Sequence, residues 1–133
     1  VAVDEFQHLV YANPSATPDE RGEMWQEVER RYMPWRQYGD LNYPASGRRW
    51  QLQRHIYGMP FYYIDYTLAQ TCALQFWVQA NADRQDAMKR YVGLCTRGGE
   101  APFQELAQSA GVISPLKAGC LKEVVQEARQ YLS

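Results

Sequence analysis

The side chains with which this chain could do chemistry are few: two histidines, three cysteines, ten tyrosines and 15 acidic residues. They lie closest together where His55 precedes a break at Gly58 and where Tyr63 and Tyr66 follow it. Tyr63 and Tyr66 are three residues apart, which places both hydroxyls on one face of a helix. Imidazole and phenol groups in a dry cleft are suitable donors to a developing oxyanion. We therefore interpret His55, Tyr63 and Tyr66 as a candidate catalytic cluster of oxyanion donors.

A purely structural role explains the same segment. Tyrosine is a common residue at the edge of a hydrophobic core, and its hydroxyl then binds a neighbouring loop. In that interpretation His55 is a structural histidine with satisfied hydrogen bonds. Residue types alone favour the structural interpretation, and they assign no role to Tyr57 or Tyr62.

The other candidates are weaker. Glu5 and His8 have the i, i+3 spacing of half a carboxylate-bridged metal site, but a second half is missing, so an ordinary ion pair on a helix surface is the better interpretation. Cys72 lies in an apolar segment without a nearby histidine, which indicates an inert thiol. The sequence contains no P-loop, G-x-G-x-x-G, G-x-S-x-G or H-E-x-x-H motif. We therefore predict no metal site within this chain.

The elements that must position the cluster are helices. Apolar spacing predicts a helix over 1–12, and Thr17-Pro18-Asp19-Glu20 is a start signal for a helix that runs to about Tyr32. Residues 37–47 carry turn chemistry. The remaining predicted helices cover 48–57, 61–80, 83–96, 102–110 and 119–131. The helix over 61–80 is apolar nearly all round, so we expect it to be central and buried. No segment has the period of a strand, and we predict an all-α, multi-helix orthogonal bundle that forms a single helical subdomain over 1–133.

Composition excludes several classes of protein. The chain has 14 basic and 15 acidic residues and no long basic stripe, so nucleic acid is not an expected partner. No run of about 18 uninterrupted apolar residues is present, and we expect no membrane span. Three widely spaced cysteines favour a reducing compartment, which makes the cytoplasm the expected location. The chain begins at Val1 inside a periodic segment, and we interpret Val1 as a cut end.

Several segments together resemble oligoendopeptidase F, a relative of thimet oligopeptidase, in order and over essentially the whole chain. The most specific match is the stretch from Pro60 to Trp77. The matching segments are Val3–His8, Tyr11–Pro14, Tyr32–Trp35, His55–Ile56, Pro60–Gln70, Cys72–Trp77, Ser114–Pro115 and Gly119–Leu121.

The resemblance implies a helical enzyme whose deep channel admits oligopeptides. It also implies a zinc ion held by an H-E-x-x-H helix and a further glutamate, with the glutamate of that motif activating the zinc-bound water. These residues are absent here. By motif position, His55 matches the family histidine that helps to bind substrate and the oxyanion. Tyr63 and Tyr66 match the family tyrosines whose hydroxyls donate to the tetrahedral intermediate, and the resemblance makes Tyr63 a substrate-binding residue as well. The loop at Met59-Pro60 differs from the more glycine-rich loop of thimet-type relatives.

Two functions follow. In the first, the chain is the C-terminal part of the catalytic domain of a zinc oligoendopeptidase, inert alone and with no zinc expected on it. Such a piece is expected to expose the surface that faced its missing lobe and to self-associate through it. In the second, the chain is a stand-alone helical interaction module whose tyrosine cluster serves as core or as a peptide-docking groove.

Overall fold

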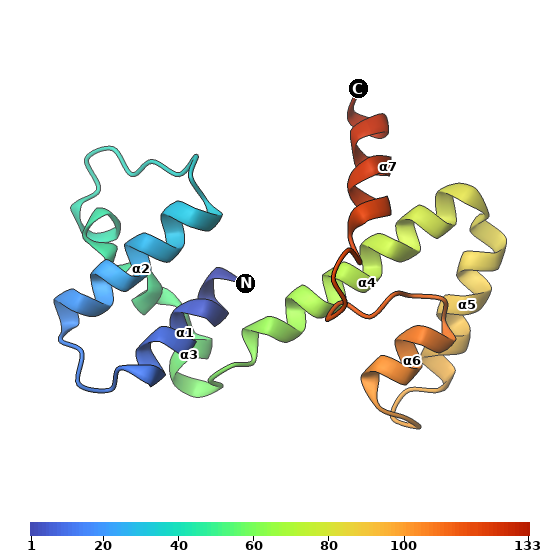
Figure 1. The fold of residues 1–133 in the computed structure, drawn as a ribbon, viewed down its shortest axis with the longest axis horizontal. Coiled ribbons are helices and arrows are strands. Elements are labelled where there is room, and N and C mark those ends of the chain that lie inside the picture. Colours follow the sequence, from blue (N-terminus) through green and yellow to red (C-terminus); the bar gives the residue numbers. More distant parts are fainter. The chain divides into compact units, whose positions relative to one another are not determined.

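The computed structural model describes all residues from 1 to 133 and contains no β-strand, which confirms the all-α prediction. Short η helices separate the second and third α-helices (Figure 1). The elements are α1 (Ala2–Ala12), α2 (Pro18–Tyr32), η1 (Pro44–Arg48), η2 (Arg49–Leu52), α3 (Arg54–Gly58), α4 (Tyr63–Ala82), α5 (Arg84–Thr96), α6 (Phe103–Ser109) and α7 (Lys122–Leu132). None of these helices is both long and apolar enough to cross a membrane.

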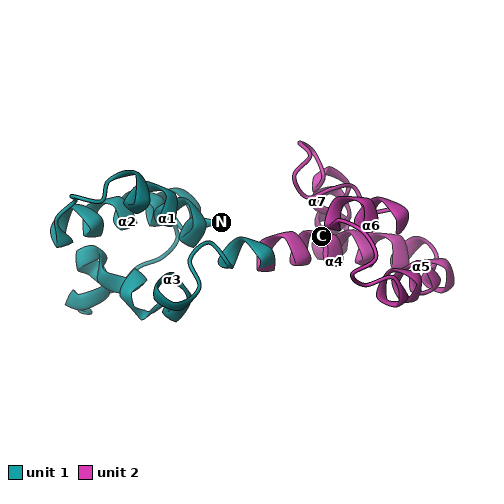
Figure 2. Cartoon of the chain, turned by 90° about the horizontal axis from the view of Figure 1, so that it is seen from below, with its two compact units in different colours: residues 1–65 teal, residues 66–133 magenta.

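The chain divides into two compact units, where the sequence predicted one subdomain. The first unit is Val1–Asp65 and the second is Tyr66–Ser133, so the boundary falls inside α4 (Figure 2). The first unit holds α1 to α3 and the first turn of α4, and the second holds the rest of α4 with α5 to α7.

Helix α2 begins as its sequence predicts. Thr17 Oγ1 accepts a hydrogen bond from the Glu20 amide at 3.3 Å, and the Thr17 amide donates to Glu20 Oε2 at 2.7 Å. This reciprocal pair is a capping box, and Pro18 occupies the first helical position, where its missing N–H costs nothing. The start signal is therefore confirmed.

The core of the first unit is aromatic. The Phe6 ring of α1 lies 5.4 Å from Trp25 of α2, edge to face, and 5.0 Å from Trp50 of η2. All three rings are buried, and four partly buried apolar residues pack around them: Val3, Val10, Met24 and Ile56. Ile56 belongs to α3, so the core fixes the helix that carries His55.

Helix α2 and η1 approach each other through two glycines. A Cβ atom built on Gly47 would lie 2.2 Å from the carbonyl oxygen of Gly22, and one built on Gly22 would lie 3.1 Å from the oxygen of Ser46. Gly47 also has φ +76°, a left-handed conformation that favours glycine. Residues 37–47, predicted as turns, thus end in a helical turn that only glycine allows to pack on α2.

The second unit corrects the expectation for residues 61–80. Helix α4 begins at Tyr63 rather than Phe61, and only Thr71 and Gln75 are fully buried in it, while its large apolar side chains are mostly half-buried. Gln75 is buried because its amide both donates to Ile113 O at 2.9 Å and accepts from Ile113 N at 2.8 Å. The small core beside it consists of Ala107, Ala110 and Val112, with Cys72, Phe76 and Leu94 packed against it.

The predicted helix over 48–57 is also divided. Residues 49–52 form a 3₁₀ turn, Gln53 is extended with φ −88° and ψ 93°, and α3 begins only at Arg54. This break turns the Gln53 side chain toward Tyr63, a contact that a continuous helix would not provide.

The Gly22–Gly47 approach can be tested by comparing two glycines with positive φ. We expect Gly47→Ala to lower the free energy of unfolding by about 3 kcal/mol or more, because both left-handed strain and a backbone clash act there. Gly39→Ala is the matched control, since Gly39 has φ +52° but nothing within 4 Å of the added atom. It should cost only about 1–2 kcal/mol. Equal losses in urea denaturation would contradict the close approach.

Candidate functional site

The structure brings His55 and Tyr63 into contact. Helix α3 carries His55, helix α4 begins at Tyr63, and residues 59–62 join the two. The ring centroids of His55 and Tyr63 are 4.9 Å apart with an interplanar angle of 80°, and the His55 ring also stacks on Tyr62 at 5.9 Å. Two residues of the predicted cluster are therefore neighbours within the first unit.

The Tyr63 hydroxyl has a protein partner in this structure. It donates to Gln53 Oε1 at 2.7 Å, in a partly buried position. A phenol can donate only one hydrogen bond at a time. The Tyr63 hydroxyl therefore stabilises an oxyanion only after rotation about its C–O bond turns the O–H from Gln53 toward the ligand. Sequence reasoning did not identify Gln53, and the only signal for it is a polar residue at a helix break.

Tyr66 is the most exposed residue of the predicted cluster. It lies on α4 three residues after Tyr63, at the start of the second unit, and 53% of its surface is exposed. An exposed phenol on the same helix as Tyr63 is accessible to a ligand. The structure thus pairs His55 with Tyr63 in the first unit, while Tyr66 belongs to the second unit and is about half exposed.

The link between α3 and α4 is held by α1. Phe61 has φ +61°, the only positive φ of a non-glycine residue in the chain. Its amide donates to Gln7 Oε1 at 2.9 Å, and its ring lies 4.8 Å from His8 and 5.0 Å from Tyr11. Sequence reasoning did not single out Gln7, whose only signal is a polar residue directly after the core residue Phe6.

Tyr57 connects the aromatic core of the first unit with helix α3, which carries His55. Its ring stacks on Trp50 with centroids 6.0 Å apart, and burial of the hydroxyl, followed by the nearby Tyr43, raises the pKa of Tyr57. Tyr57 stands two residues after His55 in α3, so this contact helps to orient that short helix. Tyr57 thus packs on Trp50 by its ring, while 61% of its surface is exposed.

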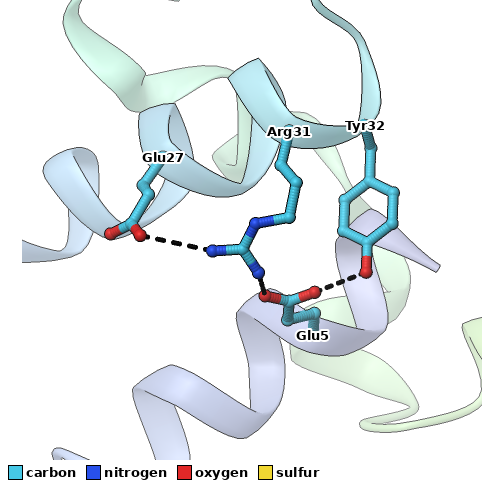
Figure 3. Close-up of polar contacts among 4 residues, drawn as sticks. All are labelled: Glu5, Glu27, Arg31 and Tyr32. Atoms are coloured by element: carbon cyan, nitrogen blue, oxygen red, sulfur yellow. Dashed lines mark hydrogen bonds and ion pairs between the residues drawn. The ribbon is translucent and has the colours of Figure 1, made fainter.

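Glu5 and His8 each pair with a different residue. Glu5 accepts hydrogen bonds from Arg31 and from the Tyr32 hydroxyl, the latter at 2.5 Å, and Arg31 also contacts Glu27 at 3.3 Å (Figure 3). His8 instead faces Asp4, with Nε2 and Oδ2 3.7 Å apart. No group of three His, Cys, Asp or Glu side chains in this structure is arranged to hold a metal ion. The ordinary helix-surface interpretation is the one observed, although the pairs differ from the i, i+3 pair that the spacing suggested.

Cys72 is a packing residue. Its side chain lies against the small core of the second unit, and burial, with a smaller effect of Cys120, raises the pKa of the Cys72 thiol. A raised pKa lowers the thiolate population that nucleophilic chemistry needs. The inert-thiol interpretation agrees with this environment.

Solved structures share this fold and much of this sequence. A crystal structure described as an oligoendopeptidase F matches with a TM-score of 0.93 and 52% identity, over 98% of this chain and 23% of that one. PZ peptidase A with inhibitor 2 matches with a TM-score of 0.92 and 50% identity, over 98% and 23%. An oligoendopeptidase F from Bacillus anthracis str. Ames matches with a TM-score of 0.75 and 44% identity, over 98% and 20%. No protein-family model and no curated protein matched the chain.

These matches define a helical segment of a peptidase fold, since they combine high identity with nearly complete coverage of the chain. The chain belongs to the oligoendopeptidase F family and corresponds to the C-terminal part of an oligoendopeptidase F structure. It spans about 23% of the length of the first two solved relatives.

The contacts of Glu5 lead to a prediction about Tyr32. The hydrogen bond to Glu5 raises the pKa of Tyr32 above its ordinary value of 10.0. This bond therefore stabilises the fold below pH 10, and its contribution is lost as the pH rises through the folded-state pKa of Tyr32. We expect Glu5→Gln to lower the pKa of Tyr32 and to cost about 1 kcal/mol of stability at neutral pH.

The measurement is an NMR titration of ring-labelled tyrosine, with Tyr32→Phe used to assign the Tyr32 signal. Glu27→Gln is the control, because Glu27 contacts Arg31 but makes no hydrogen bond to Tyr32. An unchanged Tyr32 titration in Glu5→Gln would show that Glu5 is not its partner.

Proposed function

We propose that this chain is the C-terminal part of the catalytic domain of a zinc-dependent oligoendopeptidase, and that it supplies the substrate-binding and oxyanion-binding wall of the active site. The observation that carries the proposal is the 44–52% identity to oligoendopeptidase F and PZ peptidase structures over 98% of the chain. The ring contact between His55 and Tyr63 supports it, because it joins two matching segments: Tyr63 lies in the most specific one, Pro60–Trp77, and His55 lies in the short match just before it.

We assign Tyr66, His55 and Tyr63 different roles in peptide hydrolysis. In peptide hydrolysis the carbonyl oxygen becomes negatively charged as the tetrahedral intermediate forms, and a donor aimed at it lowers the barrier. Tyr66 is exposed and is the direct phenol donor in this proposal. His55 binds the substrate and offers an imidazole N–H to the oxyanion. Tyr63 orients His55 through their edge-to-face contact and binds substrate. It becomes a second hydrogen-bond donor when its hydroxyl turns away from Gln53.

The residues of this chain do not fit a zinc site. No three metal-binding side chains come together, and the sequence contains no H-E-x-x-H motif. The proposal therefore assigns the zinc ligands and the general base to other parts of the parent protein. This chain contributes donors and packing, and no step of the reaction is assigned to a metal bound to it.

Inactivity of the isolated chain is the first test. We expect the 133-residue chain to leave fluorogenic oligopeptides intact, with or without added zinc, because it supplies oxyanion donors but no activated water. The full-length parent assayed beside it should cleave the same peptides in a chelator-sensitive reaction. Zinc-dependent cleavage by the isolated chain would contradict the assignment.

The second test concerns Tyr66 in the full-length enzyme. Tyr66→Phe should lower kcat by roughly 10²–10³-fold, the cost of one lost oxyanion donor, while KM and zinc content change little. Tyr57→Phe is the matched control, since Tyr57 stacks on Trp50 through its ring and is assigned no part in catalysis. Normal turnover in Tyr66→Phe would remove Tyr66 from the proposed role.

The remaining expectations from the sequence stay predictions. They are oligopeptide substrates for the parent protein, a cytoplasmic location, the absence of a nucleic-acid partner and self-association of the isolated chain. Gel filtration of the isolated chain over a range of concentrations measures the last of these. No feature of either unit favours the stand-alone interaction module over the peptidase segment.

A further inference from the structure

We propose that Gln7 is a positioning residue of the His55–Tyr63 pair, acting through the left-handed backbone of Phe61. This inference rests on the proposed function, because it concerns the placement of the residues assigned to the oxyanion wall. It gives α1 the role of positioning these residues, which membership of the family alone does not indicate. Gln7, Phe61, His55 and Tyr63 all lie in the first unit.

The segment between α3 and α4 contains an unfavourable backbone conformation. Phe61 has φ +61°, where the Cβ atom of an L-residue crowds its own backbone. Phenylalanine is bulky and has no side-chain polar group to compensate locally, so the surrounding structure must hold this conformation. Two residues later the chain enters α4 at Tyr63.

Gln7 supplies the polar part of that restraint. Its Oε1 accepts the Phe61 N–H at 2.9 Å, across 54 positions of sequence, and its Nε2 donates to Val3 O at 3.3 Å. Only 1% of Gln7 is exposed. Burying an amide is unfavourable unless it is hydrogen-bonded, so a position beside Phe6 would ordinarily be better filled by an apolar residue. The hydrogen bond to Phe61 accounts for the glutamine.

His8 and Tyr11 supply the apolar part. Their rings flank that of Phe61 at centroid distances of 4.8 and 5.0 Å. Helix α1 therefore holds Phe61 by its backbone through Gln7 and by its ring through the next turn of the same helix. Because Phe6, the residue before Gln7, lies in the aromatic core, this restraint is anchored to the most buried part of the unit.

The restraint fixes the geometry of the site. Tyr62, which follows Phe61 directly, stacks on His55, and Tyr63 meets the edge of the same imidazole. A return of Phe61 to negative φ would redirect the chain that enters α4 and would separate these rings. Displacements of about 1 Å at a catalytic group lower turnover by up to about 10²-fold, so the restraint matters for rate even if the fold survives its loss.

The experiment uses the full-length enzyme with Gln7→Met, which keeps length and volume but removes the strong acceptor. We expect kcat to fall by roughly 10- to 100-fold with KM and zinc content nearly unchanged, and the Phe61 amide to exchange with deuterium at least about tenfold faster because its partner is gone. Gln7→Glu keeps an oxygen that accepts the same N–H but loses the donor to Val3 O and buries an acid, so it should protect the Phe61 amide and keep kcat only where that acid is neutral. Gln7→Asn, one methylene shorter, replaces the methionine variant if that variant does not fold.

Gln75→Met is the matched control. Gln75 is also a buried glutamine whose amide holds a distant backbone segment, at Ile113, but it makes no contact with residues 59–62. It should lower the unfolding temperature without changing kcat per folded enzyme or the exchange of the Phe61 amide. The same change of kcat in Gln75→Met and Gln7→Met would overturn a specific positioning role.

Failure of this inference and failure of the proposed function give different results. If Tyr66→Phe impairs turnover while Gln7→Met keeps normal kcat, the role of Gln7 is overturned and the proposed function stands. If Gln7→Met loses activity only in proportion to its unfolded fraction, with the Phe61 amide still protected, Gln7 is merely structural and the inference is overturned. If the wild-type enzyme cleaves no peptide, the proposed function is overturned, and the catalytic consequence of Gln7 with it.

Discussion

The Phe6 ring between Trp25 and Trp50 is the contact on which the first unit depends. Three buried aromatic rings from α1, α2 and η2 remove a large apolar area from water, and edge-to-face packing adds a directional term. Because Phe6 is fixed there, its neighbours in α1 point at defined targets. Glu5 reaches Arg31 and Tyr32, and Gln7 reaches Phe61. One helix thereby holds both the packing of α2 and the entry to α4.

Two glutamine side chains bind the residues that surround the His55–Tyr63 contact. The Tyr63 hydroxyl donates its hydrogen bond to Gln53, and this bond keeps the ring in place. Tyr66 is about half exposed. The Gln7 side-chain oxygen accepts a hydrogen bond from the Phe61 amide. Both glutamines lie outside the predicted cluster: Gln53 binds Tyr63, a member of the cluster, and Gln7 binds Phe61, two residues before Tyr63. The proposed wall therefore consists of donors and of the amides that orient them.

Much of the fold could be predicted from local signals. The capping box at Thr17, the proline at helix position one and the glycine-rich turns gave the helix boundaries, because each depends on neighbours within a few residues. The prediction that residues 61–80 form a buried central helix was wrong. In α4 only Thr71 and Gln75 are buried, both of them polar, and the large apolar side chains are mostly half-buried. Apolar content predicts burial only when a partner covers every face, and no partner does so for α4 within these 133 residues.

The residues themselves fixed which side chains could take part in chemistry. An oxyanion needs N–H or O–H donors, and the chain gathers a histidine and several tyrosines in one segment, residues 55–66. The resemblance to oligoendopeptidase F then narrowed the candidates to His55, Tyr63 and Tyr66. Tertiary structure decided how they are held. The 54-residue separation of Gln7 and Phe61, the left-handed φ of Phe61 and the bond from Tyr63 to Gln53 have no local sequence pattern, because each exists only after α1 and α3 have packed around the same aromatic core.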